Sequence, residues 1–159
     1  MINVTRQAYL EGFTPAEIFA TLSDTQALAH ILPRVQRVEV TRRNNDTRTA
    51  RVVTYMNIGG IFGTIRSEGE LTWEDDRAIR FKVRTPVQVE TTWELVQVRT
   101  GTDIQLTTSL NLAPMLGPMA SIVPTQQVSE MMATELETVL KALARRMRES
   151  KPRERAIAA

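Results

Sequence analysis

The chain has 159 residues, of which 42% are hydrophobic and 24% are charged, and its formal net charge is +2. This composition is typical of one globular domain and excludes a disordered chain, which would carry fewer apolar residues and more net charge. With no cysteine and one histidine, the chain cannot form disulfides, thiolate metal sites or multi-histidine sites, so we expect no metal and no cofactor. No apolar run has the ~20 residues of a membrane span, and the first six residues do not resemble a signal peptide. We therefore expect a cytoplasmic protein.

In chain order, the first predicted element is a strand over residues 2–11, where apolar and polar residues alternate. The segment Thr14-Pro15-Ala16-Glu17 then combines an N-cap residue, a proline suited to the first turn and a glutamate three positions after the cap. This pattern predicts a short helix. Ser23 and Asp24 both offer an N-cap for a second short helix, which ends before Pro33.

Six more strands are predicted between residues 35 and 112. The turns between them are short, which favours an antiparallel meander over a parallel sheet. Alternation within the strands gives each one an apolar face, as in residues 64–74, where Ile65, Leu71 and Trp73 share one side. The predicted strands are residues 35–41, 47–56, 64–74, 77–85, 88–99 and 103–112.

A long amphipathic helix is predicted over residues 125–149, because apolar residues recur there at spacings of three and four. Basic residues gather at this end: the charge from Lys141 onward is +5, and the rest of the chain carries −3. Nucleic-acid-binding proteins usually add stacking aromatic residues, and residues 141–159 contain none. We expect no nucleic-acid partner. Residues 150–159 are interpreted as a frayed basic tail that offers at most weak contact to a membrane or protein surface.

Residues 14–24 (TPAEIFATLSD), followed by Leu32-Pro33 and residues 35–40 (VQRVEV), resemble the opening of the helix-grip superfamily. This superfamily includes START lipid-transfer domains, plant pathogenesis-related allergens and polyketide cyclases. Within it, residues 1–149 look like a single domain similar to polyketide cyclase/dehydrase proteins and to proteins of the carbon-monoxide-dehydrogenase G-subunit type. The resemblance implies an α+β helix-grip fold: a strongly curved antiparallel sheet of about seven strands around a long C-terminal helix, with two short helices after the first strand. It carries no catalytic motif over to this chain.

A curved sheet that grips a helix encloses either a packed core or an apolar cavity. The favoured function is a binding or carrier protein that holds a small hydrophobic molecule in such a cavity, for example a lipid, a polyketide-like molecule, an isoprenoid or a quinone. The predicted ligand-binding residues come from the inward strand faces, a glycine-rich apolar segment and the start of the long helix: Arg6, Tyr55, Phe62, Ile65, Ser67, Trp73, Phe81, Trp93, Leu106, Met115, Met119, Met132 and Leu136. Thr91 and Thr108 are further hydroxyl donors on inward positions.

Three points stay open at the level of sequence. Arg6 lies on an apolar strand face, so it either pairs with a carboxylate, meets a ligand oxygen or is exposed by a bulge. A cyclase or aromatase is the less favoured alternative, and it would need Arg6, Tyr55 or His30 together at the cavity. An accessory protein that docks a partner through the C-terminal helix and basic tail is the third hypothesis.

Overall fold

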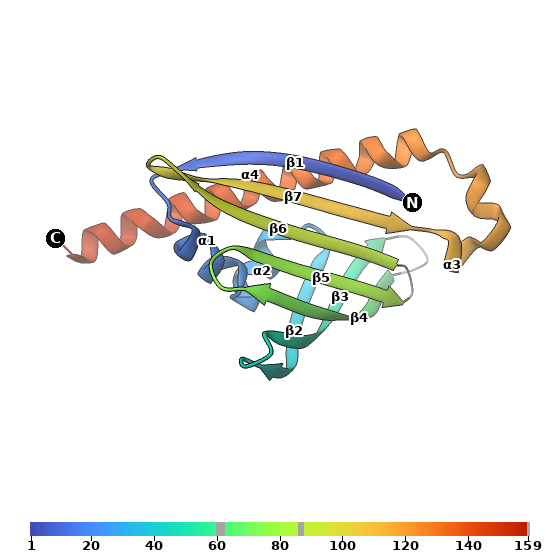
Figure 1. Ribbon diagram of the computed structural model, residues 1–159, viewed down its shortest axis with the longest axis horizontal. Coiled ribbons are helices and arrows are strands. Elements are labelled where there is room, and N and C mark those ends of the chain that lie inside the picture. The colour runs from blue at the N-terminus through green and yellow to red at the C-terminus, as the bar shows by residue number, and fades with distance from the viewer. Residues whose placement is uncertain (60–62, 86–87, 159) are drawn as a thin grey trace.

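The computed structural model (Figure 1) describes the backbone of residues 1–59, 63–85 and 88–158, and the side chains of these residues except 58–59, 85, 115 and 151–158. Seven strands and several helices follow one another in this part of the chain. Their order is β1 (Ile2–Glu11), α1 (Pro15–Leu22), α2 (Thr25–Ile31), β2 (Val35–Asn44), β3 (Thr49–Gly59), β4 (Gly63–Glu74), β5 (Ala78–Thr85), β6 (Gln88–Val98), β7 (Gly101–Asn111), α3 (Ala113–Leu116), the 3-10 helix η2 (Gly117–Ile122) and α4 (Thr125–Ala158).

The strands form one antiparallel sheet in the order β1-β7-β6-β5-β4-β3-β2. The meander from β2 to β7 is as predicted, and β1 returns to pair with β7 along its whole length, from Ile2 opposite Leu110 to Glu11 opposite Gly101. The sheet curves around α4, which packs along β1 (Figure 1). The predicted α+β helix-grip architecture is therefore confirmed.

The two short helices begin at the caps that the sequence predicted. The Thr14 hydroxyl accepts a hydrogen bond from the backbone N–H of Glu17 at 3.2 Å, and the Glu17 carboxylate accepts one from the backbone N–H of Thr14 at 3.3 Å. This reciprocal capping box fixes the start of α1. The Asp24 carboxylate accepts from the backbone N–H of Gln26 at 3.0 Å and fixes the start of α2.

Two features after β7 differ from the prediction. The segment of residues 113–122, for which no element was predicted, forms α3 and η2, because proline is accepted in the first turn of a helix. Helix α4 continues to Ala158, beyond the predicted end near Glu149. The predicted end followed the loss of the apolar pattern, and that pattern reports burial and not the helical backbone itself.

The hydrophobic core lies between α4, the short helices and one half of the sheet. Leu143 of α4 is fully buried, and Ile18 of α1 and Ile104 of β7 pack into the same cluster. Among the described residues, β2 and β3 contribute nothing to this cluster. The other half of the sheet is therefore not packed directly onto the core.

A candidate ligand-binding cavity

A cavity of about 550 Å³ separates the concave face of the sheet from α2 and α4. Strands β2 to β7 form its floor, α1 and α2 close one side, and α4 covers it with Met132, Leu136 and Val139. Its walls consist mainly of aliphatic and aromatic side chains. Its volume lies within the range typical of small-molecule sites, about 300–1,000 Å³.

The cavity stays open because the side chains that β3 points toward it are, except for Met56, small. Ala50, Val52 and Thr54 alternate on this face, and each is more than nine-tenths buried. Such residues reach only a short distance from the sheet, so they do not contact the side chains of α4 across the gap. The apolar concave face of this part of the sheet therefore lines a cavity.

Gly69 shapes the same wall from β4. A Cβ atom at this position would lie 2.9 Å from Cε2 of Phe81 and 2.6 Å from the carbonyl oxygen of Lys82. Both distances are shorter than van der Waals contact, so only glycine lets the Phe81 ring lie against β4 here. The β4–β5 pairing also shifts register between Glu68 and Gly69, and such a shift increases the local bend of the sheet.

Many of the predicted site residues meet at this cavity. They come from β4 to β7 and α4, and the strand alternation that predicted their inward direction holds throughout these elements. The residues on the wall are Ile65, Ser67, Trp73, Phe81, Trp93, Leu106, Met132 and Leu136, together with Thr91 and Thr108. The Thr91 and Thr108 hydroxyls lie 3.3 Å apart and bond to each other across β6 and β7.

Arg6 does not line the cavity. Its strand pairs with β7 without a bulge, so no register shift exposes it. Instead, its Nε donates to Oε1 of Glu137 on α4 at 3.1 Å, and its side chain remains 42% exposed. The paired-carboxylate explanation is therefore the correct one: Arg6 ties the edge strand to the long helix.

Tyr55, Met119 and His30 also lie away from the cavity. Tyr55 points to the convex face, where the Arg37 guanidinium lies 5.7 Å from its ring centroid. The adjacent valines at 52 and 53 leave the strand parity ambiguous in the sequence, and this ambiguity explains the wrong assignment. Met119 is 61% exposed on η2, and His30 is exposed at the end of α2. The predicted Phe62 and the Met115 side chain lie outside the described residues.

Among the wall residues that were not predicted, three polar ones bear on the function: Thr54, Arg43 and Glu135. Thr54 shares the parity of Val52, so the correct strand face would have identified it. Arg43 lies near the end of β2, where its guanidinium is 5.0 Å from the centroid of the Trp73 ring. Glu135 of α4 has an oxygen 3.9 Å from Nε of an arginine in the α2–β2 connection, a contact that no local sequence pattern reports.

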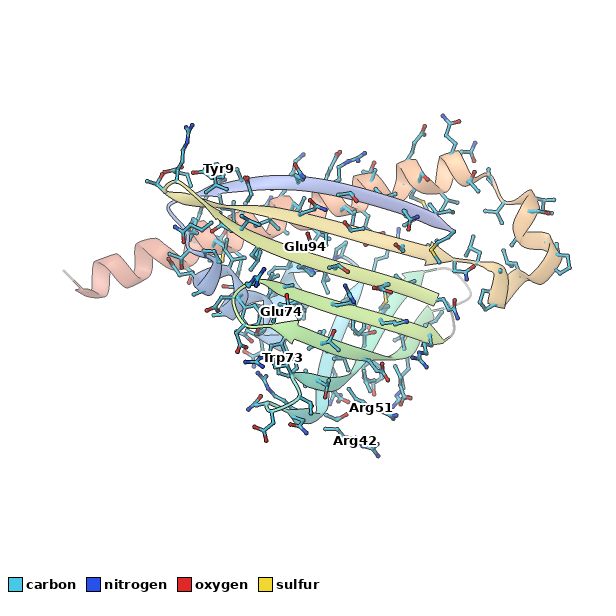
Figure 2. All side chains as sticks on the ribbon, in the orientation of Figure 1. Tyr9, Arg42, Arg51, Trp73, Glu74 and Glu94 are labelled. Atoms are coloured by element: carbon cyan, nitrogen blue, oxygen red, sulfur yellow. The ribbon has the colours of Figure 1, made fainter. Side chains whose placement is uncertain are left out.

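The groups with perturbed pKa values lie outside the cavity. Hydrogen bonds from Thr100 and from Tyr9 lower the pKa of the Glu11 carboxyl, and the bond to Glu11 raises the pKa of the Tyr9 hydroxyl. Tyr9 marks this end of β1 in Figure 2. The pKa of Arg66 is raised by its contact with Tyr55 on the convex face. None of these groups contacts the cavity, so the perturbed titrations do not point to acid–base chemistry inside it.

Metal ligands and membrane-spanning helices are both absent from the described residues. These residues contain no group of three or more histidine, cysteine, aspartate or glutamate side chains placed to hold a metal ion. No helix in the described part of the chain has the length and apolar character needed to cross a membrane.

A curved antiparallel sheet, two short helices after its first strand and a long helix over an apolar cavity define a START-like, helix-grip protein. The profile of the family described as "Polyketide cyclase / dehydrase and lipid transport" matches residues 1–148, and the chain belongs to this family. No curated protein matches the chain in sequence.

Solved structures with the same fold share little sequence with this chain. A protein from Thermus thermophilus has a TM-score of 0.75 and 21% identity, with 93% of this chain and 98% of that chain covered. A START superfamily protein from Mycobacterium smegmatis has a TM-score of 0.70 and 19% identity, with 92% and 97% covered. The Zhui aromatase/cyclase from Streptomyces sp. R1128 has a TM-score of 0.69 and 14% identity, with 92% and 93% covered. At these identities the likeness establishes the fold alone.

Proposed function

We propose that this protein binds or carries a small hydrophobic molecule in the cavity between the sheet and α4. The observation that supports this most strongly is a 550 Å³ space with mainly apolar walls. Leaving that space empty sacrifices packing, whereas an apolar guest is stabilised by about 2.5 kcal/mol per 100 Å² of surface that it buries. Lipids, polyketide-like molecules, isoprenoids and quinones all have suitable chemistry.

The distribution of charge supports binding over catalysis. Among the described wall residues, Arg43 and Glu135 are the ionisable ones. Arg43 lies against Trp73, and Glu135 lies near Arg34, with both side chains of that ion pair partly exposed. The rest of the wall offers hydroxyl groups and hydrocarbon, which hold and orient a molecule but do not readily transfer protons at neutral pH.

Native mass spectrometry of freshly purified protein tests this proposal. We expect a fraction of the chains to carry one additional small mass, and organic extraction should release it as an apolar molecule. The proposal is contradicted if only the bare chain is found and the refolded protein also takes up no apolar probe.

Cyclisation is the second candidate, because the family includes polyketide cyclases and Glu135 places one carboxylate on the cavity wall. The enclosure would hold a reactive chain in a bent conformation, and Glu135 would accept a proton from it. The version that relies on Arg6, Tyr55 and His30 is not supported, since these residues lie apart. Cyclised product formed from a poly-β-ketone substrate and lost in Glu135→Gln would favour this function over simple carriage.

A further inference from the structure

The cavity contains one pair of hydroxyl groups whose environment differs from every other polar group described on its wall. Thr54 on β3 and Ser67 on β4 are direct partners in the antiparallel pairing, so their Cβ atoms lie roughly 5 Å apart on the same face. Both side chains line the cavity. Their relative exposures are 5% and 7%, which makes both residues more than nine-tenths buried.

Neither hydroxyl has a hydrogen-bond partner in the part of the chain that the structure describes. Other inward threonines are satisfied: Thr102 donates to the carbonyl oxygen of Phe13 at 2.7 Å, and Thr91 pairs with Thr108. Among the described residues, no side-chain oxygen is both inaccessible to solvent and without a hydrogen-bond partner. The Thr54 and Ser67 oxygens must therefore be accessible from the cavity.

When an apolar guest excludes water from the cavity, a hydroxyl without a partner becomes costly, and a guest with a matching polar group removes that cost. The surroundings indicate which kind of group would match. On the concave face the neighbours of the pair are apolar, with Met56 and Ile65 on one side and Val52 on the other. Arg43 lies five residues along β2 from Val38, the partner of Thr54, which places it roughly 16 Å away.

We propose that the Thr54–Ser67 pair is a specificity site for an uncharged oxygen of the ligand, a carbonyl or a hydroxyl group. This inference rests on the proposed function and narrows it to neutral, oxygenated hydrophobic molecules. A carboxylate at this position would lose its hydration, and Arg43, the cation among the described wall residues, lies too far away to compensate. A hydroxyl pair both donates and accepts, so it satisfies a ketone, an ester carbonyl or an alcohol equally well.

The test compares two probes in the wild type and in the double variant Thr54→Val/Ser67→Ala. Diphenylhexatriene, a fluorescent hydrocarbon, reports the cavity itself, and 2-dodecanone, which displaces it, reports the oxygen site. We expect the double variant to bind the ketone about three- to tenfold more weakly, the range of one lost hydrogen bond, while its affinity for diphenylhexatriene, which has no oxygen, does not fall. Ser67→Ala alone should give part of this loss, and Thr72→Ala, on the exposed face of the same strand, should give none.

The results distinguish failure of the proposed binding function from failure of the proposed specificity site. If the wild type binds neither probe, the proposed function fails. If diphenylhexatriene binds normally and the ketone affinity is the same in the wild type and the double variant, the specificity site is wrong while the cavity stands. Thermal stability is a second readout: because the hydroxyls lack protein partners, the double variant should be at least as stable as the wild type. A marked loss of stability would show that the hydroxyls serve the fold and would overturn the inference.

Discussion

A substitution that places a larger side chain on the cavity wall distinguishes an open binding site from a packed core. Val52 faces the cavity from β3 and is 5% exposed, whereas Ile104 is 1% exposed in the core cluster and does not line the cavity. In the variant Val52→Phe, the larger side chain has free space to enter. In the control Ile104→Phe, it has none, so we expect overpacking to cost about 1–3 kcal/mol. This corresponds to a fall in Tm of roughly 2–12 °C for a chain of this size.

The two variants should also differ in ligand affinity. Val52→Phe adds about four carbon atoms to the wall. If the ligand then buries about four fewer methylenes, its binding free energy falls by roughly 3 kcal/mol as an upper bound, which raises the Kd about 200-fold. Differential scanning fluorimetry gives the stability, and a diphenylhexatriene titration gives the affinity. The reasoning is refuted if Val52→Phe loses as much stability as Ile104→Phe, because the space beside Val52 would then be filled in the native protein.

Three further outcomes are expected. Gly69→Ala should lower the Tm by several degrees, since the new Cβ would lie 2.6 Å from a carbonyl oxygen of β5; an unchanged Tm in a thermal melt would contradict this geometry. Arg34 and Glu135 should show a coupling of less than about 1 kcal/mol in a double-mutant cycle by urea denaturation, because both side chains are exposed; a larger coupling would show that the ion pair is shielded from water. The hydrogen bond from Thr100 lowers the folded-state pKa of Glu11 below its ordinary value, so its stabilisation is present above the ordinary pKa and is lost as the pH falls through the folded-state pKa. Glu11→Gln should flatten this acid limb of the Tm profile, and an identical profile in both proteins would argue against the contact.

The inward face of β4 was predictable because Ile65, Leu71 and Trp73 share one side of the strand and charged residues occupy most of the other side. Ile65, Ser67 and Trp73 needed only the strand period to be placed on the cavity wall. In β3 the adjacent Val52 and Val53 are both apolar, so the period does not define a face, and Tyr55 was assigned to the wrong side. Burial of Val53 on the convex side of the strand causes this ambiguity.

The sequence pattern did not predict contacts between distant parts of the chain. Arg6 meets Glu137 across 131 positions of sequence, and the pattern indicated only that a buried arginine needs a partner. The open cavity itself depends on whether side chains from β3 reach those of α4. The length of the side chains at positions 50, 52 and 54 matters only once the curvature of the sheet is known.

The most direct measurement of the central claim uses the two tryptophans of the chain as internal reporters. Trp73 and Trp93 both line the cavity, and a bound diphenylhexatriene molecule would lie close enough to accept their excitation energy. We expect saturable energy transfer at one probe per chain, reversed by 2-dodecanone and weakened in Val52→Phe. Transfer that does not saturate, or that is identical in the wild type and Val52→Phe, would contradict the claim that this cavity holds the guest.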